Sequence, residues 1–108
     1  MLNITERQNG NNTILDLEGN IILGGGSKKL GQEVSRLIGE NKADIVLNLS
    51  GVKYIDSSGV GELLSLSQAA SSAGGSLKLS NIPQKVEEVL TLSSVLPIFE
   101  IYEESGEN

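Results

Sequence analysis

The sequence predicts a single α/β domain, in which a mixed, mostly parallel sheet of about five strands packs with about three helices. The chain has 108 residues, which is the size of one domain. Short apolar runs rich in β-branched residues alternate along it with longer segments of helical periodicity. Near the N-terminus, an Asn- and Gly-rich turn joins two strands directly. This hairpin is therefore expected to form an antiparallel edge of the sheet.

The first strands and helix follow from local patterns. Leu2 and Ile4 alternate with polar residues, and residues 14–17 form a second strand that ends at Gly19. Residues 20–23 are a further apolar stretch. The three glycines after it lead to Ser27, the expected N-cap of a helix. The apolar residues of that helix recur at helical spacing: Leu30, Val34, Leu37 and Ile38.

Three more strands and two more helices complete the pattern. Residues 45–49 read as a buried strand that turns at Ser50-Gly51. A helix follows Asp56-Ser57-Ser58 and a strand contains residues 77–79. The last helix starts at Asn81-Ile82-Pro83, and residues 98–102 form the last strand. The domain is thus expected to cover residues 1–102, followed by a polar tail at 103–108.

Composition excludes several functions. The chain contains no His and no Cys, which removes the usual nucleophile pairs and zinc sites. Its net charge of −6 argues against direct binding to nucleic acid or to an anionic membrane. Neither a signal peptide nor an apolar run of membrane-spanning length is evident. The expectation is a cytoplasmic protein that is not an enzyme and holds no metal or cofactor.

Two glycine-rich segments do not match nucleotide-binding motifs. Residues 24–29 lack the Gly-x-x-x-x-Gly-Lys-Ser/Thr order, and Gly59-Val60-Gly61 lacks the third glycine of a dinucleotide fingerprint. The turn Asp56-Ser57-Ser58 is more informative. It places a carboxylate and two hydroxyls at a helix N-terminus, where the free N–H groups favour an added phosphate. From the residues alone, simple helix capping ranks ahead of phosphorylation.

Residues 45–61 resemble the signature of the STAS domain, and most closely that of the bacterial anti-sigma factor antagonists, or anti-anti-sigma factors. The resemblance rests on a hydrophobic strand, the Asp-Ser-Ser-Gly-aliphatic-Gly turn at residues 56–61, and the helix that follows. Flanking segments extend it over nearly the whole chain. It implies a protein-interaction module that controls the availability of a sigma factor.

The resemblance also implies partners and site residues. An unphosphorylated antagonist binds an anti-sigma factor that is a serine kinase, and phosphorylation releases it; a serine phosphatase reverses the change. ATP and Mg²⁺ belong to the kinase. The expected acceptor is Ser58, with Ser57 as the fallback. The expected partner-binding residues lie in the turn and in the loop before the first helix: Asp56, Ser57, Gly59, Val60, Gly61, Ile22, Leu23 and Gly24.

Two departures from the family pattern leave an alternative open. The segment Gly19-Asn20-Ile21-Ile22 lacks the acidic residue that well-studied antagonists carry there. The sequence after Tyr102 also lacks the usual C-terminal helix, which is expected to leave a sheet face exposed to a partner helix or a weak homodimer. The alternative is a STAS module that binds a partner or a small ligand without being phosphorylated.

Overall fold

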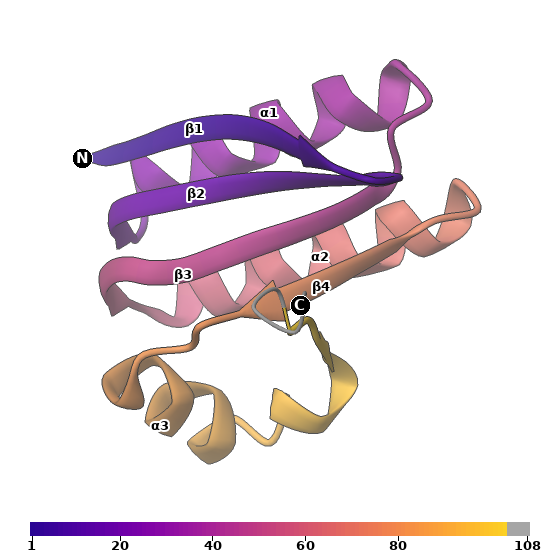
Figure 1. Cartoon of the computed structure of the whole chain (residues 1–108). Coiled ribbons are helices and arrows are strands. Elements are labelled where there is room, and N and C mark those ends of the chain that lie inside the picture. Colours follow the sequence, from indigo (N-terminus) through magenta and orange to yellow (C-terminus); the bar gives the residue numbers. More distant parts are fainter. Residues whose placement is uncertain (104–108) are drawn as a thin grey trace.

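The computed structural model describes residues 1–103 (Figure 1). The chain order is two strands, then helices and strands in alternation. The elements are β1 (Leu2–Asn9), β2 (Asn12–Ile21), α1 (Gly26–Gly39), β3 (Asp44–Ile55), α2 (Ser57–Ser72), β4 (Ser76–Ser80), α3 (Gln84–Leu92), the 3-10 turn η1 (Leu96–Ile98) and β5 (Glu100–Ile101).

The strands form one mixed sheet in the order β1-β2-β3-β4-β5. Strands β1 and β2 are antiparallel, and every later neighbour pair is parallel. Each parallel connection passes through a helix, as parallel neighbours require. The predicted fold class is confirmed: five strands, an antiparallel N-terminal hairpin at one edge, and three helices.

Two helices cover one face of the sheet. Helices α1 and α2 lie side by side behind the strands in Figure 1, while α3 lies below them and nearer the viewer. The inward-facing residues of the central strands, such as Leu15 and Leu47, are fully buried under the helices together with Leu63 of α2. None of the helices within residues 1–103 combines the length and apolar character needed to cross a bilayer.

The expected turn at Ser50-Gly51 is wrong, because β3 runs through it without interruption. Its pairing with β2 shifts register between Asp16 and Glu18, so Gly51 pairs with Glu18. A Cβ at Gly51 would come 2.7 Å from the carbonyl oxygen of Leu17. This glycine therefore allows two strands to approach closely at an irregularity in the pairing, and does not mark a change of direction.

The junction between β2 and α1 also differs from the expectation. Strand β2 continues past Gly19 to Ile21, and α1 already begins at Gly26. Gly25 occupies the N-cap position without any side-chain capping bond. Ser27 is therefore not the N-cap; it lies inside the first turn of α1 and is only 6% exposed.

The end of the described chain is less regular than expected. Ile98 belongs to η1, and β5 contains only Glu100 and Ile101. The backbone N–H of Tyr102 donates to Leu79 O at 2.8 Å, which adds one hydrogen bond beyond the strand. Of the predicted tail at 103–108, Glu103 is exposed, and residues 104–108 lie outside the described part of the chain.

The second face of the sheet carries a polar network. The guanidinium of Arg7 contacts the carboxylate of Asp16, which accepts from Asn48 at 2.7 Å. Asn48 in turn accepts from Asn81. The hydrogen bonds with Arg7 and Asn48, of which that with Arg7 is the stronger influence, lower the pKa of the Asp16 carboxyl. This network joins the first three strands to the loop that follows β4.

The expectation of an exposed apolar sheet face is wrong for the described residues. Ile14 and Val46 are the apolar side chains at the centre of the second face, and both are fully buried. The hydroxyl of Tyr102 accepts from Asn9 of β1 at 2.9 Å, although the Tyr102 backbone is bonded to β4. The Tyr102 side chain therefore extends over the intervening strands and helps to shield this face.

Candidate functional site

The candidate site lies where the parallel strands β2 and β3 end and the helices α1 and α2 begin. In open α/β sheets the crevice outside the carboxyl ends of the strands is the usual binding position. The backbone N–H of Asp56 approaches Ile21 O at 3.4 Å, so the two strand ends remain adjacent. The β2–α1 loop and the turn before α2 consequently lie side by side, although about 33 residues separate them in the chain.

Asp56 holds these two segments together. One carboxylate oxygen accepts from Gly59 N at 2.9 Å and caps α2; the other accepts from Leu23 N at 3.1 Å, in the β2–α1 loop. These hydrogen bonds, that from Leu23 above all, lower the pKa of the Asp56 carboxyl. The residue is therefore an anion at neutral pH. Its carboxylate caps α2 and also holds the β2–α1 loop next to the turn.

The two serines of the turn differ in their surroundings. Ser57 is exposed, whereas Ser58 is half-buried. The Ser58 hydroxyl donates to the hydroxyl of Ser27 at 3.3 Å, across the gap between α2 and α1. Because Ser27 is buried, the bond turns the Ser58 hydroxyl toward α1. Of the two candidate acceptors, Ser57 has the more accessible side chain and Ser58 has the more defined orientation.

The residues that follow the serines divide into an internal pair and an exposed one. Gly59 is buried, and a Cβ there would overlap the carbonyl oxygen of Ile21 and the side chain of Ile55. Val60 belongs to the core. Both residues are among the expected partner-binding residues, but the chain itself covers them, so neither offers an open surface to a partner. Gly61 is exposed, with no atom within 4 Å of a built Cβ, so its surface is open.

The β2–α1 loop becomes exposed after its first residue. Ile22 is half-buried, Leu23 is 78% exposed, and Gly24 is exposed with a φ of +101° that a side chain would strain. Leu23 is one of the few large apolar side chains with such exposure among residues 1–103. The structure thus brings the predicted loop residues and the predicted turn residues onto one surface.

Sequence reasoning misses two residues that adjoin this surface. The sequence indicates Ser27 as a helix cap, and only the fold brings its buried hydroxyl to that of Ser58. Tyr54 lies two positions before Asp56 and is 59% exposed at the end of β3. Its exposure could have been suspected from the polar Lys53 beside it, but a strand-end aromatic is ordinarily assigned to the core.

The turn places a hydroxyl where an added negative charge would be stabilised. A hydroxyl stands at a helix N-terminus, whose unsatisfied N–H groups and positive dipole end stabilise added negative charge. Within residues 1–103 no three acidic, His or Cys side chains converge on a common point. The turn contains no general base for its own hydroxyls apart from Asp56, whose carboxylate is already engaged with two backbone N–H groups.

Comparison with known proteins places these features in context. The sequence profile of the STAS domain matches residues 3–108. The anti-sigma-B factor antagonist of Bacillus subtilis (strain 168) is 27% identical over 100 residues, covering 93% of this chain and 90% of the relative. A candidate anti-sigma factor antagonist from Thermotoga maritima superposes with a TM-score of 0.85 at 26% identity, covering 96% of this chain and 89% of that one.

A further similarity concerns the fold alone. The anti-sigma factor antagonist SpoIIAA, solved in its unphosphorylated form, superposes with a TM-score of 0.71 at 18% identity. The alignment covers 97% of this chain and 91% of SpoIIAA. The phosphorylated form of the same Bacillus protein gives a TM-score of 0.71 at 19% identity, over 95% and 94% of the two chains.

Proposed function

The chain belongs to the STAS domain family, and we propose that it is an anti-sigma factor antagonist whose unphosphorylated form binds a serine-kinase anti-sigma factor. Phosphorylation of Ser58 releases the complex, and a serine phosphatase restores the binding form. In this role the protein is a regulated partner in the cytoplasm, not an enzyme. The similarity to the Bacillus subtilis antagonist over most of both chains supports the proposal.

The observation that carries the proposal is the position of Ser58 in the α2 N-terminal turn. The hydroxyl lies beside Asp56, and Asp56 also holds the loop that presents Leu23. A partner that covers Leu23, Gly24 and Gly61 would therefore lie over the acceptor itself. A change at the Ser58 hydroxyl would then lie within the interface and alter the affinity for the partner.

The covalent step takes place in the partner's nucleotide site. The Ser58 oxygen attacks the γ-phosphorus of ATP, the bond to the β–γ bridging oxygen breaks, and ADP leaves. The hydroxyl proton passes to a base of the kinase. The phosphatase reverses the modification by hydrolysis, in which water supplies the oxygen of the released inorganic phosphate. ATP and Mg²⁺ thus belong to the kinase, and the antagonist contributes only the hydroxyl.

Release follows from the charge of the product. A phosphoserine carries about −1.5 to −2 charges at pH 7. Esterification removes the proton that Ser58 donates to Ser27 and places this charge next to the Asp56 carboxylate. An interface that fitted the neutral turn would then have to accommodate a larger group and a concentrated negative charge, so affinity falls.

The proposal is tested with purified serine-kinase anti-sigma factors from the same genome. With ATP and Mg²⁺, intact mass should increase by one phosphate on the native chain and on Ser57→Ala, and stay unchanged on Ser58→Ala. Loss of phosphate from Ser57→Ala but not from Ser58→Ala would transfer the acceptor role to Ser57. If no kinase of this class either binds or modifies the native chain, the proposed function is refuted.

A second function is favoured by one observation, the hydrogen bond that holds Ser58 against buried Ser27. A serine fixed in this way suits a binding module whose turn is never modified, which takes up a protein or small ligand constitutively. Ser58→Ala and Ser58→Glu variants separate the two functions by their affinity for the native partner. Equal affinity of both variants supports constitutive binding, whereas loss only with Ser58→Glu supports the phosphorylation switch.

A further inference from the structure

An exposed aromatic residue lies immediately beside the turn. The chain has three aromatic side chains; Phe99 is buried and Tyr102 is half-buried by its contact with β1, so Tyr54 alone is well exposed. Tyrosine is among the residues that contribute most to binding when a partner covers them. The ammonium of Lys85, from the start of α3, lies 5.6 Å from the centre of the Tyr54 ring and helps to hold it in place.

Hollows adjoin Tyr54 on two sides. One, of about 280 Å³, is bordered by Ile55 and by residues of α3, including Val86 and Val89; the other, of about 340 Å³, is bordered by Val52 and the residues that open α3. Lys53, Tyr54 and Lys85 line both hollows. We name these three residues the lysine–tyrosine patch. Tyr54 lies four positions before Ser58, and Ile55, which borders the first hollow, packs against Gly59 of the turn that carries Ser58.

The charge of the patch differs from that of the chain as a whole. The net charge is −6, and Arg7, Arg36 and Lys42 are engaged in ion pairs with carboxylates. Within the described residues, Lys53 and Lys85 form no ion pair, and both are exposed. Two unneutralised ammonium groups flanking an exposed ring favour a ligand that carries carboxylates.

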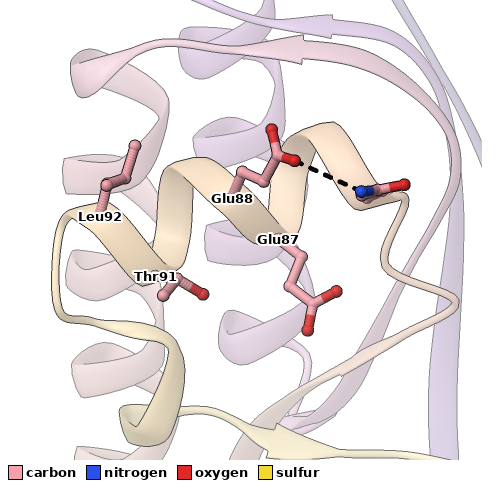
Figure 2. Close-up of a pocket in the computed structure, with 5 residues that line it drawn as sticks. Glu87, Glu88, Thr91 and Leu92 are labelled. Atoms are coloured by element: carbon pink, nitrogen blue, oxygen red, sulfur yellow. Dashed lines mark hydrogen bonds between the residues drawn. The ribbon is translucent and has the colours of Figure 1, made fainter.

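Among the residues that line the two hollows, Glu88 alone carries a carboxylate. Glu88 of α3 borders the first hollow, but it accepts a hydrogen bond from Gln84 at 3.4 Å and is turned toward the start of the helix (Figure 2). Figure 2 also shows Glu87 directed to a different side of α3. The outer surface of α3, with exposed Leu92, is therefore acidic and does not suit the same ligand.

We propose that the lysine–tyrosine patch is a second contact area of the partner interface and binds an acidic segment of the partner protein. The identity of the partner rests on the proposed function, whereas the preference for carboxylates rests on the patch itself. The patch extends the interface beyond the neutral turn with contacts that phosphorylation of Ser58 does not modify. It thereby contributes affinity and orientation while the turn supplies the switch.

The proposal is tested on the full chain with two probes. The first is the kinase that binds the native chain in the experiment above; the second is a hexaglutamate peptide, with hexaglutamine as its neutral match. Lys85→Glu should weaken binding of the kinase and binding of hexaglutamate by about fivefold each. Tyr54→Ala should weaken kinase binding about tenfold or more. The control Lys42→Glu makes the same change of charge in the loop between α1 and β3, and should change the affinity for either probe by no more than about twofold.

Glu88→Gln provides a test of opposite sign, because it removes negative charge beside the patch and should strengthen both interactions by about twofold. Amide spectra of the ¹⁵N-labelled chain should show saturable peptide-induced shifts at residues 52–55 and 84–86. The same spectra establish that each variant remains folded. Ser58→Ala should bind the peptide like the native chain.

The outcomes separate this proposal from the proposed function. Where a kinase binds the native chain, unchanged affinity with both Lys85→Glu and Tyr54→Ala overturns the lysine–tyrosine patch, whatever happens at Ser58. Where no kinase binds, the proposed function fails, and the amide shifts induced by hexaglutamate test the lysine–tyrosine patch on its own. Shifts that are absent, equal with hexaglutamine, or spread over every lysine then overturn the proposal, and saturable shifts confined to the patch support it.

Discussion

Gly59 and Gly61 stand two positions apart in the first turns of α2, yet the structure places opposite demands on them. Gly59→Ala forces a methyl group against Ile21 and Ile55, and should destabilise the protein by about 1–3 kcal/mol, the usual cost of overpacking. Gly61→Ala meets open space and should stabilise the helix by up to about 1 kcal/mol. Urea unfolding of the two variants measures this difference.

The same pair separates stability from binding. If a partner covers the turn, Gly61→Ala should weaken partner binding while it strengthens the fold, because the added methyl group occupies the interface. Equal stability of both variants would show that Gly59 is not packed as described. Unchanged partner affinity of Gly61→Ala would place Gly61 outside the interface.

Two aspartates govern the response of the fold to acid. Hydrogen bonds lower the pKa of Asp56, chiefly through Leu23 N, and that of Asp16, chiefly through Arg7, below the ordinary value of 3.8. Their stabilising contribution is therefore complete above that value and is lost as the pH falls through the folded-state pKa. The urea midpoint should stay level from pH 7 to about pH 5 and fall below about pH 4.

The urea midpoint of the double variant Asp16→Asn/Asp56→Asn should fall less steeply below about pH 4 than that of the native chain. Neither side chain in the variant can take up a proton on unfolding. Asp44→Asn, at the exposed start of β3, provides the matched control. A double variant that loses stability as steeply as the native chain would contradict the assignment. Increased stability of the native chain on acidification would contradict it more directly.

At the scale of the elements, the contact between α1 and α2 joins the two loops of the site. Ser27→Ala removes the partner of Ser58, and should cost about 0.5–1.5 kcal/mol, the net value of one such hydrogen bond. If phosphorylation requires the Ser58 hydroxyl to turn away from α1, its initial rate should not fall. Unfolding curves and intact-mass time courses test both statements.

Ser35→Ala is the matched control, since Ser35 lies on the exposed side of the same helix. It should leave stability and phosphorylation rate close to those of the native chain. A slower reaction with Ser27→Ala would show that Ser27 prepares the serine for modification and does not restrain it.

Periodicity and glycine punctuation predicted the type and order of the elements, because each strand and helix buries one regular face. These local patterns gave wrong element boundaries where contacts between distant segments determine the structure. Gly51 resembles a turn residue, but it serves a strand pairing whose partner lies over 30 residues away. Serine is a typical N-cap residue, which favours Ser27 as the start of the helix. The helix instead begins at Gly26, which packs against the backbone of Asn20. Neither contact is encoded within a local window.

The site was predicted to a similar extent. The Asp56 cap and the serine turn are local, and their placement at the start of α2 is confirmed. The internal role of Gly59 depends on the end of β2, and the pairing of Ser58 with Ser27 depends on how two helices meet. Both needed the sheet order, which a motif does not contain.

At the scale of the whole molecule, Tyr102 links opposite parts of the sheet. Tyr102→Phe removes only the hydrogen bond with Asn9 and should cost about 0.5–1.5 kcal/mol. Tyr102→Ala also removes the ring that extends from β4 toward β1. If this ring covers the buried Ile14 and Val46, the substitution should cost about 2–4 kcal/mol. Faster amide exchange at these two residues should accompany the larger loss.

Self-association offers a second measurement of this cover. By sedimentation velocity, Tyr102→Ala should associate more strongly than the native chain, because an apolar patch becomes accessible. Tyr102→Phe should sediment like the native chain. Equal sedimentation and equal amide exchange in all three proteins would mean that Tyr102 does not shield the sheet.

The order of the strands has a consequence for how the chain assembles during synthesis. Each strand is hydrogen-bonded to its predecessor in the sequence, so no strand must be inserted between two that are already paired. A chain emerging from the ribosome can add one strand at a time to a growing edge, beginning with a hairpin whose contacts are local. Because α2 precedes the last strand pairings, the Ser58 turn can form on a nascent chain. Tyr102 joins the sheet later and completes its second face.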